Sequence, residues 1–291
     1  MTPAHVVQIV TPKRYLLNGL WFGSKKPKRV IVWVHGLGSS AFSKVGIAGK
    51  IADKKTAVLM FNNRGHDVVA TVYKKGSLTE KKFKRTVAGA AHERFIDCVD
   101  DIQGAINFAR RTGAKRIYLA GHSTGCQKSI YWAHKKKGRG VCGIVLLGPV
   151  NDYAGAVAWH GRSRVEKATK YARTLVARGK PHEMLPAIIW KEESDDAQRF
   201  LSLYLPESVE NIFSYDQPKK SPRILRSVCI PILVLWAGAD EFADRPAQAI
   251  TDWFRNEIRG GRVVTVPRVS HGFKGGEQIV AKEIKKFAGT N

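Results

Sequence analysis

The chain has 291 residues, enough for one large α/β domain with a sizeable core, and 49 Lys and Arg against 24 Asp and Glu give a formal net charge of +25. Its 44% of hydrophobic residues excludes a disordered chain, and no stretch approaches the ~18 consecutive apolar residues that span a bilayer. The first ten residues lack the basic start of a signal peptide and the four cysteines have no CxxC spacing, so we expect a soluble cytoplasmic protein with free thiols.

Short β-branched runs alternate with longer helical patterns along the chain, which predicts a mostly parallel sheet flanked by helices. A hairpin strand is expected first, at the N-terminal edge, over 14–23. The later apolar runs are nearly continuous, as in strands that are buried on both faces. In chain order these predicted strands are 30–34, 57–61, 116–120, 143–147, 231–236 and 263–266.

Apolar side chains recur every three or four residues between the strands and predict helices, most clearly over 91–110 and around Val280 to Phe287. Asp244 is interpreted as the N-cap of another helix, with Pro246 in its first turn. The polar and basic stretch 65–90 has no such pattern, and we expect a mobile loop there.

The alternation stops after Pro149 and resumes at Ile230. We therefore predict one α/β core formed by 1–150 and 229–291, with 151–228 inserted as a helical lid or cap. The helical stretches expected in the insertion are 164–178, 182–191, 194–204 and 222–227.

A nucleophile motif lies between a predicted strand and a predicted helix. The sequence Gly121-His122-Ser123-Thr124-Gly125 matches the G-x-S-x-G pattern, in which a serine occupies a sharp strand-to-helix turn. The glycines on either side are needed for steric reasons, and the turn aims backbone N–H groups at a developing oxyanion. Ser123 is therefore the predicted nucleophile.

An acid and a base follow the serine in the chain order that such hydrolases require. Asp240 comes directly after the strand 231–236, and His271 after the strand 263–266, so both are expected at the carboxyl edge of the sheet. His271 would take the proton of Ser123, and Asp240 would orient the imidazole. Glu241 and Asp244 are alternative acids, although the predicted helix cap explains Asp244 better.

A loop after the strand 30–34 is expected to complete the oxyanion hole. His35-Gly36-Leu37-Gly38 allows close approach of the backbone to a substrate, and we assign the two donors to the N–H groups of Leu37 and Thr124. His35 is expected to brace this loop. The substrate-binding candidates are His35, Gly36, His122 and Arg64.

With these residues in place, the chain resembles an α/β-hydrolase of the serine esterase and monoacylglycerol-lipase-like type. The resemblance spans 30–287 apart from the insertion, which corresponds to the lid of that family. The matching landmarks are the loop 35–38, the turn 63–66, the elbow 121–125, the acid segment 238–240 and Ser270-His271. The resemblance implies an α/β-hydrolase fold and a Ser-His-Asp mechanism.

Several other residues have a structural and a functional interpretation. Arg64 and His66 could contact substrate, but an ordinary polar turn explains them better. Cys126 should point into the core and not act as a nucleophile. The histidines have no metal-ligand spacing and no nucleotide motif is present, so we expect neither metal nor cofactor. These histidines are His92, His134, His160 and His182.

The positive charge raises the alternative of a nucleic-acid-binding protein. The insertion holds 13 Lys and Arg against 10 Asp and Glu, and the rest of the chain holds 36 against 14. The excess is therefore on the core and spread over many elements, so a generally basic surface explains it better than a nucleic-acid partner. The sequence does not indicate an oligomeric state.

The sequence thus predicts a serine carboxylic-ester hydrolase that forms an acyl-enzyme, with a small-molecule ester as its partner. Alternatives with the same three residues are a thioesterase, amidase, C–C hydrolase or acyltransferase. The insertion has more apolar side chains than a surface helix pair needs, so some are expected to pack on the body and the surplus to wall an acyl pocket for neutral, apolar esters of short to medium length. The apolar side chains of this set are Met184, Leu185, Ile188, Ile189, Trp190, Phe200, Leu201, Leu203, Tyr204, Ile212 and Phe213.

Overall fold

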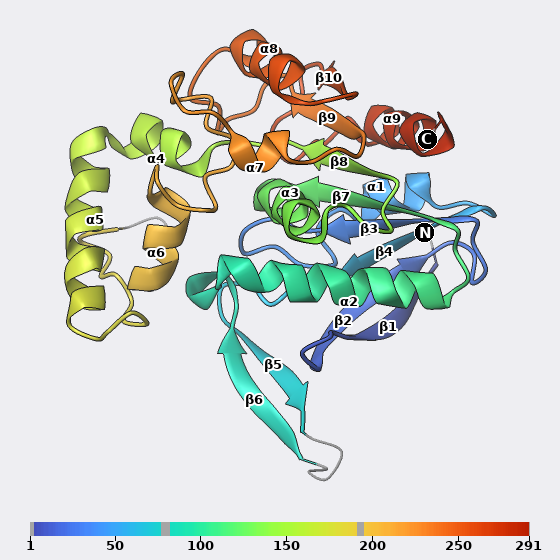
Figure 1. The fold of residues 1–291 in the computed structure, drawn as a ribbon, viewed down its shortest axis with the longest axis horizontal. Helices are drawn as coiled ribbons and strands as arrows, with labels where there is room; N and C mark the ends of the chain where they lie inside the picture. Colours follow the sequence, from blue (N-terminus) through green and yellow to red (C-terminus); the bar gives the residue numbers. More distant parts are fainter. Residues whose placement is uncertain (1–2, 77–81, 191–194, 291) are drawn as a thin grey trace.

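The computed structural model describes residues 3–76, 82–190 and 195–290, and its strands form one ten-stranded sheet (Figure 1). The order across the sheet is β10-β9-β8-β7-β3-β4-β2-β5-β6, with β1 paired to β2. The strands are β1 (Ala4–Val10), β2 (Tyr15–Phe22), β3 (Arg29–Val34), β4 (Thr56–Phe61), β5 (Ala70–Lys75), β6 (Phe83–Ala88), β7 (Arg116–His122), β8 (Gly143–Leu147), β9 (Ile232–Ala237) and β10 (Arg262–Val266).

The parallel part of the sheet consists of β3, β4 and β7 to β10, which are the six strands predicted from the apolar runs. Nearly every residue of β4, β7, β8 and β9 is buried, because helices cover both faces. The expected strand at the N-terminus is β2. It is not an edge strand, however, because β1 pairs along one side of it and β4 and β5 pair along the other.

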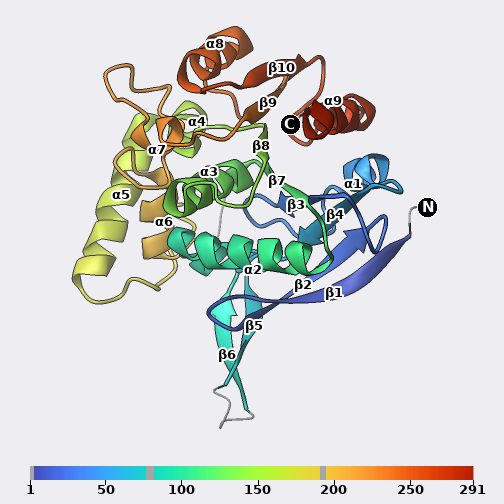
Figure 2. The same cartoon turned by 45° about the vertical axis from the view of Figure 1, so that its right-hand side comes forward.

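Helices form a layer on each side of the sheet (Figures 1 and 2). Apolar side chains of α1 and α9 pack on one face, and those of α2, α3 and α8 pack on the other. The helices of the core are α1 (Val45–Ile51), α2 (Cys98–Arg111), α3 (Thr124–Lys136), α8 (Ala247–Glu257) and α9 (Glu277–Thr290), with the short 3₁₀ turns η1 (Ala90–His92) and η2 (Phe95–Asp97).

The prediction of a mobile loop over 65–90 is wrong, because β5 and β6 pair there as an antiparallel hairpin that projects from the body (Figure 1). Ala70 pairs with Ala88, and Lys75 with Phe83. Val72 is buried on the inner face, whereas Tyr73 and Phe83 are exposed. The basic residues are adjacent in both strands, as Lys74-Lys75 and Lys84-Arg85, so they fall on both faces and obscure the period of two that a half-buried hairpin shows. Residues 77–81 of this stretch lie outside the described residues.

The segment 151–228 contributes helices and no strand of the sheet in its described part. They are α4 (Asp152–His160), α5 (Arg162–Ala177), α6 (Ala197–Tyr204) and α7 (Arg223–Arg226). The sequence pattern missed α4, and the helix expected over 182–191 is wrong for 182–190. That stretch forms turns around Pro186 and an isolated bridge between Met184 and Asp196. Lys191 and Ser194, also expected in helices, lie outside the described residues.

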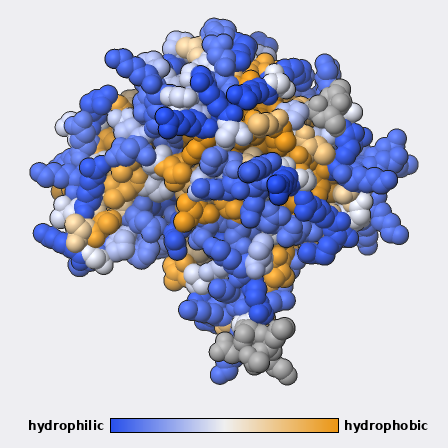
Figure 3. All heavy atoms as spheres, in the orientation of Figure 1, coloured by the Kyte–Doolittle hydropathy of each residue, from blue (hydrophilic) through white to orange (hydrophobic). Residues whose placement is uncertain are grey.

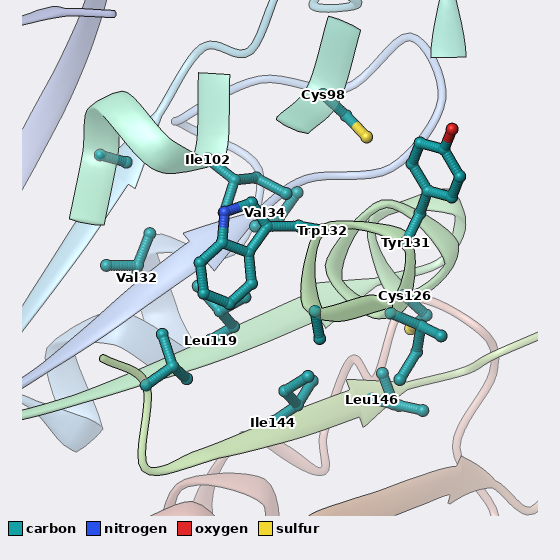
Figure 4. Close-up of a cluster of buried hydrophobic side chains, with 14 of the residues drawn as sticks. Val32, Val34, Cys98, Ile102, Leu119, Cys126, Tyr131, Trp132, Ile144 and Leu146 are labelled. Atoms are coloured by element: carbon teal, nitrogen blue, oxygen red, sulfur yellow. The ribbon is translucent and has the colours of Figure 1, made fainter. Parts of the chain in front are cut away.

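Many of the core side chains belong to the strands and helices that the sequence predicted. Figure 4 shows Ile102, Trp132 and Leu119 packed between α2, α3 and the sheet, with Cys126 beside Leu146.

The surface in Figure 3 is covered largely by hydrophilic residues with hydrophobic patches between them. No helix in the described part of the chain is long and apolar enough to cross a membrane.

Candidate active site

Ser123 occupies a strained turn between β7 and α3. Its backbone has φ 55° and ψ −130°, a left-handed conformation that a non-glycine residue rarely adopts. The Ser123 N–H donates to the carbonyl of Leu147 at 2.9 Å, which fixes the turn to the neighbouring strand β8. A strained residue between a strand of the sheet and the helix that follows it is typical of a nucleophile elbow.

The glycines of the motif are required sterically, as the sequence predicts. A Cβ at Gly121 would lie 2.3 Å from the carbonyl oxygen of Gly125, and a Cβ at Gly125 would lie 2.1 Å from the carbonyl oxygen of Val34. Real Cβ atoms do not come so close to backbone oxygens. The turn can therefore form only with glycine at both places.

His271 and Asp240 meet in the loops that follow β10 and β9. His271 Nδ1 lies 2.9 Å from Asp240 Oδ2, and the Asp240 side chain is fully buried. Asp240 Oδ1 also accepts the N–H of Phe242 at 3.1 Å. His271 and Ser123 line the same cavity. The structure thus brings together the three residues that the sequence singled out.

The two alternative acids have other partners. Glu241 Oε2 accepts the backbone N–H of His271 at 2.7 Å. Asp244 Oδ2 accepts from the Arg245 guanidinium at 2.7 and 2.9 Å. The prediction that Asp244 caps a helix is wrong, because α8 begins at Ala247 after Pro246 and its N-cap position has no side-chain hydrogen bond. The carboxylate is held by the arginine next to it instead.

Two further side chains hold the loop that carries His271. His122 Nε2 lies 2.9 Å from the His271 carbonyl oxygen and donates to it, because a carbonyl can only accept. Lys44 Nζ donates to the carbonyl of Gly272 at 2.9 Å. Burial lowers the pKa of His122 well below its usual value, so this imidazole is neutral. His122, a substrate-binding candidate from sequence, therefore also positions His271.

The loop 35–38 passes directly beside Ser123. A Cβ at Gly36 would lie 2.7 Å from Ser123 Cβ and 3.3 Å from Ser123 Oγ, so only glycine permits this approach. Leu37 follows at once and lines the cavity with Ser123. Thr124 is the first residue of α3, where a backbone N–H has no partner within the helix. This placement supports the assignment of the Leu37 and Thr124 N–H groups as oxyanion donors.

His35 braces this loop as a neutral, fully buried imidazole. Its Nε2 accepts the N–H of Asn63 at 3.2 Å, so the proton is on Nδ1, which donates to the Gly36 carbonyl at 2.9 Å. Burial lowers the pKa of His35 to about 3, with the nearby Lys128 ammonium adding to the effect. The His35 imidazole is therefore uncharged at neutral pH.

The sequence reasoning missed a network of buried ion pairs that connects α3 with α6. Lys128 of α3 is fully buried and its Nζ lies 2.6 Å from Glu93 Oε1. Arg199 of α6 reaches Glu93 Oε2 at 3.5 Å and pairs with Glu210 at 2.6 Å. These charges draw the pKa of Glu93 below its usual value despite its burial. The sequence did contain a signal for this network, because Lys128 and Arg199 lie on otherwise apolar helix faces.

The cavity at Ser123 has a volume of about 340 Å³ and lining that differs from the prediction. The wall was expected to come from the surplus of eleven apolar residues of the insertion, all within the described residues, and of these Tyr204 lines the cavity. Most of the others form a separate apolar cluster with α5 and α6, because their helices bury them against one another. The remaining lining consists of Gly36, Leu37, Ser39, His122, Ser123, Val150, Asn151, Asp152, Gly155, Ala156, Trp159, His160, Phe242 and His271.

Two aromatic rings of this lining stack on each other. The rings of Trp159 and Phe242 have centroids 5.4 Å apart and planes 20° apart, and Phe242 also meets the edge of His271 at 5.0 Å. Trp159 Nε1 donates to the Glu241 carbonyl at 3.1 Å. Helix α4, which the sequence pattern missed, therefore contacts the acid-bearing loop directly.

Arg64 lies elsewhere. Its guanidinium contacts Asp101 at 2.7 Å and Asp100 at 3.2 Å and stacks on the Tyr15 ring, and it does not line the Ser123 cavity. The structural interpretation of Arg64 thus fits better than the substrate contact. Cys126 is buried, and its Sγ faces the carbonyls of Gly121 and Leu147, which supports the prediction of a core thiol.

Spacing along the chain gave no metal ligands, but the fold brings two of the histidines to one carboxylate. His92 Nδ1 and His182 Nδ1 each lie 2.9 Å from Asp196 Oδ2. The residues come from three separate segments, so the sequence pattern had no signal for this cluster. It lies outside the lining of the Ser123 cavity.

A sequence model of the family described as "Protein of unknown function (DUF1749)" matches residues 92–265. No curated protein matches the chain.

Among solved structures, DcsB in complex with its substrate analogue is similar with a TM-score of 0.70 at 15% identity, over 99% of both chains. Est1E from Butyrivibrio proteoclasticus with bound ferulic acid has a TM-score of 0.63 at 16% identity, over 97% of both chains. The α/β-hydrolase GrgF from Penicillium sp. sh18 has a TM-score of 0.62 at 15% identity, over 98% of both chains. At such identities the similarity establishes the fold, which is that of the α/β-hydrolases.

Proposed function

Since the chain belongs to the family described as "Protein of unknown function (DUF1749)" and has the α/β-hydrolase fold, we propose that it is a serine carboxylic-ester hydrolase. The observation that carries the proposal is the meeting of Ser123, on its strained turn, with the His271–Asp240 pair at one cavity. Est1E, which has the same fold, is an esterase by name and supports the reaction class.

In this mechanism the Ser123 hydroxyl attacks the ester carbonyl carbon while His271 Nε2 accepts its proton. Asp240 keeps the proton of His271 on Nδ1 and stabilises the imidazolium. The N–H groups of Leu37 and Thr124 hold the oxyanion of the tetrahedral intermediate. The alcohol leaves with the proton from His271. Water then attacks the acyl-enzyme with His271 as base, which releases the acid and restores Ser123.

The cavity favours neutral acyl groups. Trp159, Phe242 and Ala156 supply apolar surface, and the Asp152 carboxylate in the lining repels an anionic acyl chain. A volume of about 340 Å³ suits a short to medium chain. The inserted helix α4 forms one wall, which fits the role of 151–228 as a cap over the site.

The test is turnover of p-nitrophenyl esters from acetate to palmitate, together with labelling by a fluorophosphonate. We expect hydrolysis with an optimum below the longest chains, and labelling of the wild type but not of Ser123→Ala. The variant should lose about 10⁶-fold in kcat, because the nucleophile is removed. Near-normal turnover by Ser123→Ala would contradict the proposal. Parallel thioesters and amides that react faster than esters would assign the same three residues to a different leaving group.

A further inference from the structure

Three metal-ligating side chains that ester hydrolysis does not use meet where η1 packs against the start of α6. His92 Nδ1 and His182 Nδ1 each lie 2.9 Å from Asp196 Oδ2, and the three ligand atoms all lie within 4.8 Å of one another. His92 ends η1 on the core, whereas His182 and Asp196 belong to the inserted segment. The cluster therefore joins the two parts of the chain.

The carboxylate is oriented before any ligand binds. Asp196 is fully buried, and its Oδ1 accepts the N–H of Arg199 at 2.7 Å as the N-cap of α6. Its own N–H donates to the Ala91 carbonyl at 2.9 Å, next to His92. Oδ2 is thereby left facing the two imidazoles. Contacts of this kind around a ligand fix its direction and strengthen metal binding.

The segment that carries His182 is tied down as well. The Ala197 N–H donates to the Glu183 carbonyl at 3.0 Å, and the Gln198 N–H donates to the Pro181 carbonyl at 2.8 Å. The first turn of α6 thus holds the backbone on both sides of His182. The His182 side chain is 61% exposed, which leaves the cluster open to ions and to a water ligand.

We propose that His92, His182 and Asp196 bind one divalent transition-metal ion, zinc in the first place, with water completing the coordination. Two imidazoles and a carboxylate are a ligand set that zinc accepts, whereas calcium and magnesium prefer oxygen ligands. Zinc lies about 2.0–2.2 Å from such atoms, so the ligand atoms of a tetrahedral site are about 3.3 Å apart. Each imidazole Nδ1 lies 2.9 Å from Asp196 Oδ2 and the three atoms lie within 4.8 Å of one another, so rotation of the side chains can bring them to this spacing.

The ion would act structurally. It would fasten the turn 180–183 and the start of α6 to η1 on the core, and it would not take part in the reaction at Ser123. Metal binding and ester turnover can therefore succeed or fail independently.

The experiment is calorimetric titration of the chelator-treated, full-length protein with Zn²⁺, in a Cys229→Ala background because that thiol is exposed. We expect one equivalent of Zn²⁺ to bind, a rise in Tm on binding, and visible absorption of a low-coordinate site with Co²⁺. His182→Ala, at an exposed position, should retain the fold by circular dichroism and lose at least about 10-fold in affinity. His92→Ala should do the same, and the control His5→Ala, on exposed β1, should bind as the parent.

Absence of stoichiometric Zn²⁺ binding by the parent protein would overturn the proposal. So would binding that is unchanged in a folded His182→Ala variant, since the ion would then lie elsewhere. Ser123→Ala should bind Zn²⁺ like the parent, which separates this inference from the proposed hydrolase activity.

Discussion

His271 reaches the Ser123 cavity because its main chain is held from both sides. Glu241 accepts its N–H at 2.7 Å and His122 donates to its carbonyl at 2.9 Å. Asp240 then needs only to set the proton on Nδ1. Of the two acidic residues next in the chain, Glu241 supports the backbone and Asp244 pairs with Arg245. Neighbouring carboxylates thus have distinct roles that substitution can separate.

Asp240→Asn should lower kcat for ester hydrolysis by about 10⁴-fold, because the amide cannot stabilise the imidazolium and favours the wrong tautomer. Asp244→Asn is the matched control, since it changes the same charge within the same loop and should retain more than half of the activity. Steady-state kinetics of the two variants decide between them. A larger loss in Asp244→Asn would transfer the acid role to that residue.

Helices α4 and α6 connect the inserted segment to the core in different ways. Helix α4 presents Trp159 to Phe242 at the cavity. Helix α6 inserts Arg199, fully buried, between Glu210 and Glu93, and Glu93 in turn pairs with Lys128. A buried charge that loses its partner cannot be solvated, so this network strongly couples the docking of α6 to the fold of the core.

Arg199→Ala should reduce the free energy of unfolding by about 3–5 kcal/mol, because Glu210 and Glu93 are left as buried charges without their shared partner. Arg173→Ala, which removes an exposed pair with Glu207, should change it by less than about 1 kcal/mol. Urea denaturation of both variants measures the difference. Equal small effects would show that the buried network does not anchor α6.

Trp159→Ala should lower kcat/KM for medium-chain esters by about 10-fold or more, since the acyl chain loses one aromatic wall, while acetate should be affected least. Ile188→Ala is the control. Ile188 is one of the apolar residues of the insertion from which the sequence predicted the pocket wall, but its side chain is 84% exposed and does not line the cavity. The ester series measured with both variants tests the lining. A chain-length effect confined to Ile188→Ala would restore the original prediction.

The molecule as a whole carries a net charge of +25, yet the groups around the proposed nucleophile include neutral imidazoles. Burial lowers the pKa of both His35 and His122. For each of them the unfolded chain binds protons more readily than the folded one. The stability that depends on these groups is therefore complete above the unfolded pKa and declines as the pH falls.

For His35 the pH range over which this stability is lost is set by a pKa lowered from 6.5 to about 3. Between pH 7.5 and 5 this group alone should reduce the free energy of unfolding by about 2 kcal/mol. In His35→Gln that part of the pH dependence should disappear, although the variant is less stable at both pH values. Urea titrations at the two pH values measure it. An unchanged pH dependence in the variant would mean that His35 does not remain neutral in the folded protein.

The sequence by itself determined the parallel strands, the elbow at Ser123 and the order of Asp240 and His271. These features depend on continuous apolar runs and on motifs of a few adjacent residues, which local sterics fix. It misjudged 65–90, α4 and the cavity wall. In 65–90, adjacent basic residues concealed the alternation of a hairpin, and the apolar helix faces expected to form a pocket packed against one another instead.

Only the tertiary structure decided which groups meet across distant segments. Arg199 with Glu93, His182 with His92, and Trp159 with Phe242 come together because the inserted segment folds back on the core. Contacts of this kind depend on three-dimensional packing and on the burial energy of charges. No spacing along the chain records either of them.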